Sequence, residues 1–138
     1  QRGIVRCWTL GHSIGQPGRM PHHIDLDEAA TQIEIRRAGW TTRGLTVGQV
    51  TWRDQGAGWP PALRTDRTQV LTPDSTGVEV RKGRQEVTLV LFDGGWADLL
   101  WWSGESQDDV LDETPGWDDW LEVGAFGDLL DRFASLFQ

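Results

Sequence analysis

The 138-residue chain has a single cysteine, a single lysine, and neither tyrosine nor asparagine. The lone Cys7 excludes a disulfide within the chain and fits a reducing compartment, so we expect the protein in the cytoplasm. No apolar run approaches the roughly 18 residues that a membrane-spanning helix needs, so we expect no membrane partner. Dinucleotide, phosphate-loop and serine-nucleophile fingerprints are also missing, and we predict no cofactor.

Lysine and arginine are missing from one long stretch, Gln85 to Asp131, which carries 13 aspartates and glutamates. Residues 1–84 have 12 basic and eight acidic side chains, a net charge of +4. Residues 85–138 have one basic and 13 acidic side chains, a net charge of −12. The overall charge of −8 disfavours nucleic acid and anionic membranes as partners, because both are negative. A folded acidic surface instead accelerates encounter with a basic protein.

The acidic stretch also contains enough apolar residues to fold. Valine, leucine, phenylalanine and tryptophan recur through residues 87–121, whereas disordered acidic tails lack such content. With 38% hydrophobic residues, the chain can bury a core of its own. We therefore expect residues 1–138 to form one domain, with the acids on its surface.

A helix is expected to begin at Asp25, whose carboxylate can accept a hydrogen bond from the amide of Glu28. Gly39 is the expected end of this helix. A strand through Ile33 and Ile35 is the alternative interpretation. The buried face of the helix would comprise Leu26, Ala29, Ala30, Ile33 and Arg37.

Short strands separated by turn residues account for much of the remaining chain. We expect strands at residues 4–10, 45–52, 68–72, 77–81, 86–92 and 96–102, with a loop at 11–23. Residues 73–76, 82–84 and 93–94 are turn-prone, and such short connections join antiparallel strands. Because residues 86–92 are apolar on both faces, this strand is expected to be central and to pair with residues 96–102.

The C-terminus returns to helical periodicity. Asp128 is the expected N-cap of a last helix, and a shorter helical turn is expected within residues 115–121. The predicted fold class is α+β, an antiparallel meander of about four to six strands with one or two helices packed against it. The apolar stripe of the last helix comprises Phe126, Leu129, Leu130, Phe133, Leu136 and Phe137.

Metal binding finds little support in the sequence. The potential ligands match no zinc signature, and neighbouring histidines point in opposite directions in an extended backbone. We therefore predict no metal site. The potential ligands are His12, His22, His23, Asp25 and Asp27.

Hydrolysis by paired carboxylates is an alternative, with Asp98 acting together with Glu105 or Asp109. A stretch with so many acids contains such pairs by chance, so we predict no catalytic residue and no enzyme. Asp98 lies between Trp96 and Leu100 on one face of an expected strand. A buried, unpaired carboxylate is costly. We therefore expect Asp98 either to face outward past the sheet rim or to accept a hydrogen bond from a buried tryptophan or arginine.

Nine tryptophans suggest either a well-packed core or a carbohydrate-binding surface. Strand patterns place Trp8, Trp52 and Trp96 in the core, and consecutive Trp101 and Trp102 must point to opposite faces of a strand. Other tryptophans lie among acids, a combination typical of protein interfaces. We predict a partner-binding site made of Glu105, Asp108, Asp109, Asp112, Glu113, Trp117, Asp118, Asp119 and Trp120.

The second half of the chain resembles a known class of proteins. Residues 77–83 (GVEVRKG), residues 86–102 (EVTLVLFDGGWADLLWW), an acidic loop and a helix containing LLDRF carry the resemblance. Over roughly residues 68–137 the chain looks like the small α+β immunity proteins of bacterial polymorphic-toxin and contact-dependent inhibition systems. The resemblance implies a cytoplasmic protein that binds a cognate toxin domain and blocks its active site. A generic interaction or secretion-accessory domain using the same acidic face is the alternative.

Overall fold

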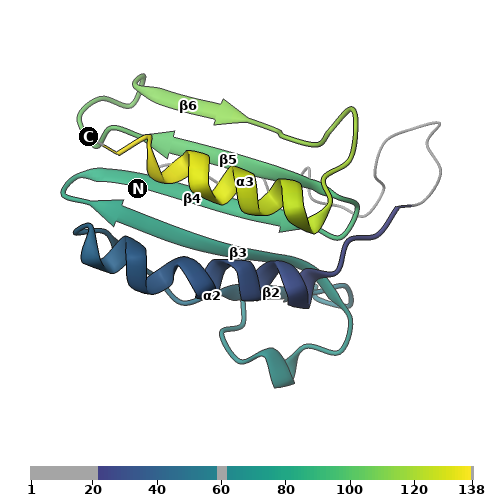
Figure 1. Cartoon of the computed structure of the whole chain (residues 1–138). Coiled ribbons are helices and arrows are strands. Elements are labelled where there is room, and N and C mark those ends of the chain that lie inside the picture. Colours follow the sequence, from purple (N-terminus) through teal and green to yellow (C-terminus); the bar gives the residue numbers. More distant parts are fainter. Residues whose placement is uncertain (1–21, 59–61, 138) are drawn as a thin grey trace.

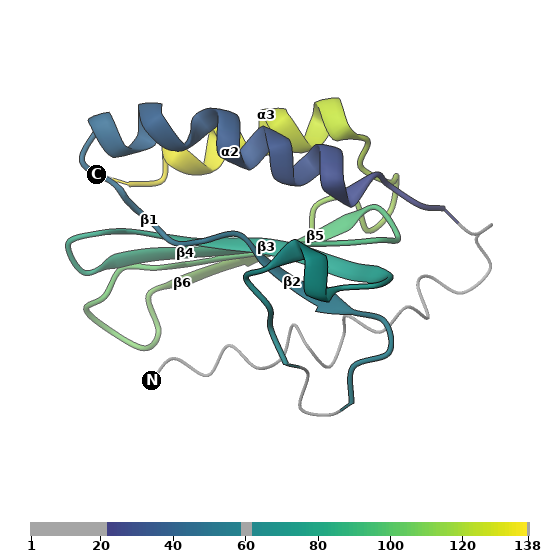
Figure 2. The ribbon, with the colours of Figure 1, turned by 90° about the horizontal axis from the view of Figure 1, so that it is seen from below.

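A six-stranded antiparallel sheet carries both helices on one of its faces (Figure 1), as the view from below also shows (Figure 2). The computed structural model describes residues 22–58 and 62–137. The α+β class predicted from the sequence is confirmed. The elements are α2 (Leu26–Thr42), β1 (Thr46–Val47), β2 (Thr51–Asp54), a short 3-10 helix (Arg67–Gln69), β3 (Pro73–Lys82), β4 (Gln85–Phe92), β5 (Trp96–Trp102), β6 (Val110–Glu113) and α3 (Val123–Ala134).

Strand β4 lies at the centre of the sheet, as its apolar pattern predicted. The strand order is β1-β3-β4-β5-β6, and β2 also pairs with β3. Leu89 of β4 pairs with Val78 on one side and with Leu99 on the other. The turn after Phe92 joins β4 to β5, and this hairpin is confirmed. Successive side chains of β4 point to opposite faces of the sheet, and each face packs against a hydrophobic cluster, so both faces of the strand are apolar.

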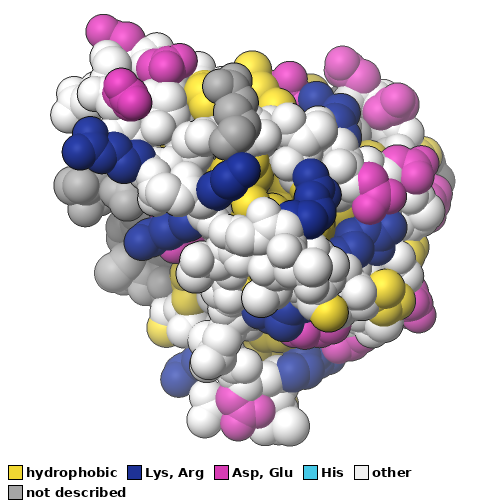
Figure 3. Space-filling model, turned by 60° about the vertical axis from the view of Figure 1, so that its left-hand side comes forward, with side chains coloured by type: hydrophobic (Ala, Val, Ile, Leu, Met, Phe, Trp, Pro, Cys, Tyr) yellow, Lys and Arg dark blue, Asp and Glu magenta, His cyan; other side chains and the backbone are white. Residues whose placement is uncertain are grey.

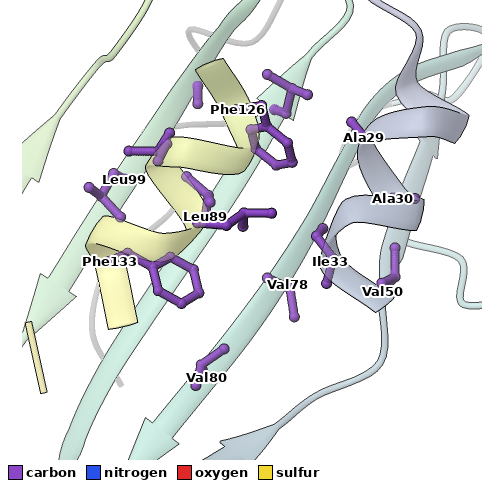
Figure 4. Close-up of a cluster of buried hydrophobic side chains, with 14 of the residues drawn as sticks. Ala29, Ala30, Ile33, Val50, Val78, Val80, Leu89, Leu99, Phe126 and Phe133 are labelled. Atoms are coloured by element: carbon purple, nitrogen blue, oxygen red, sulfur yellow. The ribbon is translucent and has the colours of Figure 1, made fainter. Parts of the chain in front are cut away.

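The main core lies between the sheet and the two helices (Figure 4). Ile33 of α2 and Phe133 of α3 are fully buried in it. The rings of Trp40 and Phe133 stack 5.0 Å apart and tie the helices together. Each buried side chain of this size contributes about 1.5–3 kcal/mol, so this layer supplies most of the stabilisation. The strands contribute Val78, Val80, Val87, Leu89, Leu91, Ala97 and Leu99.

A second, smaller cluster forms on the opposite face of the sheet. Val90, Phe92 and Trp96 are each less than 5% exposed there. The rings of Phe92 and Trp96 stack 4.5 Å apart, and Trp117 packs edge-on against Trp96 at 4.9 Å. The site described below therefore adjoins an aromatic cluster of the sheet.

Helix α2 begins as predicted but ends later. The Glu28 amide donates to Asp25 Oδ1 at 3.0 Å, which confirms the cap. The predicted end at Gly39 is wrong, as is the alternative strand through residues 33–35, because the helix continues to Thr42. Trp40 is 3% exposed, so burial of its ring offsets the helix penalty of glycine, about 1 kcal/mol. Gly44, with φ of +89°, follows the helix end instead.

Three predictions for residues 45–76 need correction. Residues 45–52 form two short strands, β1 and β2, rather than one, and both pair with β3. The predicted strand at 68–72 is wrong, because Asp66 caps a 3-10 helix by accepting from the amide of Thr68 at 3.0 Å. Residues 73–76 belong to β3 instead of forming a turn.

The last part of the chain also differs from expectation. Helix α3 begins at Val123, after Glu122, so the predicted N-cap at Asp128 is wrong. Residues 115–119 form turns, and no helix occurs within residues 115–121. Strand β6, which the sequence did not predict, pairs with β5 at the end of the sheet. The expected strand at residues 4–10, loop residues 11–21 and the position of Trp8 lie outside the described residues.

Candidate functional site: an acidic edge surface

The predicted partner-binding residues lie along one margin of the sheet, on β6 and the connections that flank it (Figure 1). They do not form one compact patch. Strand β6 separates a group in the β5–β6 loop from a group in the turn that follows, by about 10 Å at 3.4 Å per residue. We call this margin the acidic edge surface; it comprises Glu105, Asp108, Asp109, Asp112, Glu113, Trp117, Asp118, Asp119 and Trp120.

Serine side chains shape the β5–β6 loop. Ser103 Oγ accepts a hydrogen bond from the Glu105 amide at 3.1 Å, and Ser106 Oγ accepts one from the Asp108 amide at 3.2 Å. The Trp102 indole donates to the Ser106 carbonyl at 2.8 Å, which fastens the loop to β5. These bonds satisfy the backbone locally, so the carboxylates of the loop remain exposed to solvent.

Glycine is required where this loop meets the β3–β4 turn. Gly104 has a φ of +84°, and a Cβ at this position would lie 2.1 Å from the Arg84 carbonyl oxygen. Any other residue would force the two connections apart. The β5–β6 loop therefore has a defined position at the end of the sheet.

The turn after β6 packs closely against the β4–β5 turn. The Leu121 amide donates to the Gly95 carbonyl at 2.6 Å, and the Ala97 amide donates to Pro115 at 2.9 Å. A Cβ at Gly116 would lie 2.6 Å from the Gly95 carbonyl oxygen. This close approach holds the turn, and Trp117 within it is 37% exposed.

Trp120 adopts an unusual backbone conformation. Its φ of +58° is the only positive value among the non-glycine residues that the structure describes. Such a conformation costs an aromatic residue about 1 kcal/mol or more. The His22 ring stacks on the indole at 4.6 Å, with 2° between the planes, and His22 Nε2 lies 3.5 Å from a Glu122 carboxylate oxygen. Trp120 therefore has a structural role in this corner, which leaves Trp117 as the more accessible aromatic side chain.

Most acids of the edge surface form no ion pair with another residue that the structure describes. Glu113 forms an ion pair with Arg132 of α3 at 2.6 Å. For five others, no lysine or arginine lies within ion-pair distance among the residues that the structure describes. Figure 3 shows basic side chains across the middle of the face that it presents and acidic ones at its margins. These five acids, all exposed, are Glu105, Asp108, Asp109, Asp118 and Asp119.

Strand β6 adds an apolar residue that the sequence analysis missed. Val110 is 42% exposed, and it pairs with Trp102 across β5 and β6. Asp112 pairs with Leu100, whereas Glu113 pairs with Leu99, so these neighbouring acids face opposite sides of the sheet. The sequence signal for this strand was Val110, a β-branched residue, followed by Leu111 within the acidic stretch.

Tryptophan placement mostly follows the sequence pattern. Trp52 and Trp96 are 5% and 3% exposed, as predicted for core residues. Trp101 packs against the helix-covered core, whereas Trp102 lies on the opposite face, which confirms that the pair divides between the two faces.

Asp98 lies inside the sheet rather than at its rim. It is 4% exposed and pairs with Val90 of β4, so the first of the two predicted arrangements is wrong. The carboxylate is not isolated in the structure. Its predicted donor, a tryptophan or an arginine, stays a prediction.

The paired-carboxylate arrangement does not form between Asp98 and Asp109. The backbone carbonyl of Asp109 accepts a hydrogen bond from the amide of Ser103, which lies five residues along from Asp98, or about 17 Å of extended strand. Carboxyl groups in glycosidases lie about 5–9.5 Å apart. This pair therefore has no hydrolytic geometry.

The candidate metal ligands also separate. His23 Nδ1 lies 2.6 Å from an Asp93 carboxylate oxygen, whereas His22 stacks on Trp120. Asp25 caps α2, and Asp27 pairs with Arg67. Within residues 22–58 and 62–137, no group of three possible ligands could hold a metal ion. His12 and Cys7 lie outside the described residues.

Comparisons with known proteins add no identification. No protein-family model, no curated protein and no solved structure matches this chain. Among the described residues, no helix is long and apolar enough to cross a membrane. The function has to be argued from the geometry of the chain itself.

Proposed function

We propose that this chain is a protein-binding module whose acidic edge surface binds a basic protein. The observation that carries the proposal is the set of exposed carboxylates that pair with no lysine or arginine among the described residues, on the same margin as the exposed side chains of Trp117 and Val110. Uncompensated charge speeds the encounter with an oppositely charged partner, and a ring that becomes buried slows dissociation. The combination favours binding over catalysis.

The rigidity of the two flanking connections supports this role. Serine hydrogen bonds hold the β5–β6 loop, and Gly95 and Gly116 hold the turn after β6. A preorganised surface loses little conformational entropy when it binds. The partner would therefore meet carboxylates in fixed positions on both sides of β6.

We further propose that the partner is a toxin domain whose activity is blocked by binding in the cytoplasm. This step comes from the resemblance to bacterial immunity proteins, and a basic active-site cleft would suit the charge of the edge surface. A secretion-accessory domain with the same acidic surface is the second candidate. Its partner would also be basic but would keep its activity when bound.

The experiment begins with the gene directly upstream of the one for this chain. A large secreted protein with a short C-terminal domain at that position supplies the ligand, and its isolated C-terminal domain is then tested for binding and for loss of activity. We expect binding that weakens as ionic strength rises, together with inhibition. Binding without inhibition would favour the accessory role.

The surface is tested with four simultaneous reversals, Asp108→Lys, Asp109→Lys, Asp118→Lys and Asp119→Lys. We expect slower association with an unchanged circular dichroism spectrum. Unchanged association in a folded variant would place the binding surface elsewhere and contradict the proposal.

A further inference from the structure

An open groove lies at the opposite margin of the sheet, between α2 and the segments around β2. Its volume is about 780 Å³, within the range of ligand-binding sites. In Figure 1 the β2–β3 connection extends below α2, and this connection contributes Thr65 and Arg67 to the lining. The groove is lined by Asp27, Ala30, Thr31, Glu34, Ile35, Arg37, Gln49, Val50, Trp52, Thr65 and Arg67.

The charged side chains of the groove neutralise one another. Arg67 Nε and Nη2 donate to the two carboxylate oxygens of Asp27 at 2.7 and 3.0 Å. Arg37 Nε and Nη2 likewise donate to the two carboxylate oxygens of Glu34 at 2.8 and 3.3 Å. The lining thus carries two cations and two anions, each in a bidentate pair. A charged ligand would have to break one of these pairs to gain a counter-charge.

Both arginines are held in place by further contacts. Arg67 Nη1 donates to the Val70 carbonyl at 2.7 Å, and its guanidinium lies 5.0 Å from the centre of the Trp52 ring. Arg37 Nη1 donates to the Val47 carbonyl at 3.2 Å. Each guanidinium is therefore held by a carboxylate and a backbone carbonyl.

The rest of the lining is apolar or neutral. Ile35 is 64% exposed, and the lining also includes Val50 and Trp52, which are 8% and 5% exposed. Gln49 and Thr65 are exposed, and neither side chain makes a hydrogen bond to another described residue. Their amide and hydroxyl groups can donate and accept, as a peptide backbone requires.

We propose that this groove binds an uncharged peptide segment, with an aliphatic side chain against Ile35 and its backbone bonded to Gln49 and Thr65. The neutral charge balance selects against acidic and basic residues, and the open shape suits an extended chain more than an enclosed small molecule. Two further exposed leucines, Leu63 at 46% and Leu71 at 88%, belong to the neighbouring connection.

The groove and the acidic edge surface lie at opposite ends of the strand order. The structure therefore has room for two partners at once, a basic protein at β6 and a neutral peptide at α2. This inference does not depend on the function proposed for the acidic edge surface.

Nuclear magnetic resonance titration of the full chain tests the inference. The probes are three capped pentapeptides, Ac-Ser-Leu-Ile-Leu-Ser-NH₂ and its counterparts with a central lysine or glutamate. We expect the neutral peptide to shift the resonances of Thr31, Ile35, Thr65 and the Trp52 indole. The charged counterparts should bind at least about tenfold more weakly.

Matched variants make the test specific. Ile35→Asp should weaken binding of the neutral peptide at least about tenfold, whereas Val110→Asp, the same kind of change at an exposed position on β6, should alter it less than about twofold. Gln49→Ala should weaken binding while leaving the fold intact. The absence of shifts at millimolar peptide, shifts confined to β6, or stronger binding of a charged peptide would each overturn the inference.

Discussion

The two margins of the sheet use acidic residues in opposite ways. At the β2 margin, Asp27 forms an ion pair with Arg67, and Glu34 forms one with Arg37. Asp54 accepts hydrogen bonds from the amides of Leu71 and Thr72. At the β6 margin, most carboxylates have no cation within ion-pair distance among the described residues. The same residue types therefore hold the fold together at one margin and remain available to a partner at the other.

The difference follows from where the positive charges occur in the chain. All but one of the lysines and arginines precede residue 85. The elements of the β2 margin come from this first part, so each acid there can meet an arginine. Strand β6 and its connections come from the acidic part of the sequence, residues 85–138, whose one basic residue is Arg132. Excess charge of one sign costs some stability through self-repulsion but favours association.

The largest expected effect concerns the buried ion pair between Arg53 and Asp74, which are 7% and 4% exposed. Asp74→Ala should lower the free energy of unfolding by about 3–5 kcal/mol, because it removes a carboxylate that pairs with a buried guanidinium. Asp118→Ala at the other margin should change it by less than about 0.5 kcal/mol. Urea denaturation measures both. A loss below about 1 kcal/mol for Asp74→Ala would contradict the view that acids at the β2 margin stabilise the fold more than those at the β6 margin.

Trp117→Ala should weaken binding of the basic partner by about 2 kcal/mol or more, mainly through faster dissociation. The matched control is Ile35→Ala, which also removes an exposed apolar side chain but at the α2 margin. Surface plasmon resonance gives both rates, and circular dichroism checks that each variant keeps its fold. Equal effects of the two substitutions would show that the anchor does not belong to the β6 margin.

Acidification should lower the free energy of unfolding by a smaller amount, through the ion pairs of the β2 margin. The hydrogen bond from Arg67 holds the pKa of Asp27 below its usual value. A lowered pKa in the folded state gives stability that is present above the usual value and is lost as the pH falls below about 4. Because Asp27 is largely exposed, we expect only on the order of 0.5 kcal/mol.

Asp27→Asn and Arg67→Ala should each reduce the loss of unfolding free energy at acidic pH. The double variant should reduce this loss no further. Urea denaturation at a series of acidic pH values measures the slope. Additive effects of the two substitutions would contradict a shared interaction.

Local signals made parts of the fold predictable. The Asp25 cap depends on residues three positions apart, and the β4–β5 hairpin on a turn between two alternating strands. Strand β6 escaped prediction because its aspartate and glutamate disfavour strands in isolation. Its pairing with β5 decides its conformation. The same holds for residues 73–76, where pairing with β2 and β4 overrides a turn-prone sequence.

The charge pattern of the sequence predicted which residues form the candidate site but not how they are arranged. Sequence reasoning grouped Asp108 with Asp118, whereas β6 holds them at its opposite ends. It also could not show the groove, because the Asp27–Arg67 pair joins residues 40 positions apart. The stacking of His22 on Trp120 likewise depends on a contact between distant segments.

The most direct test of the acidic edge surface compares two variants of equal net charge. One carries Asp108→Lys and Asp118→Lys on that surface; the other carries Glu28→Lys and Asp128→Lys on the exposed sides of α2 and α3. The measurement is the rate of association with the basic partner at low ionic strength. The account predicts at least about tenfold slower association for the first variant and a much smaller change for the second. Equal slowing in both would mean that overall charge, rather than the β6 margin, governs binding, and would contradict the central claim.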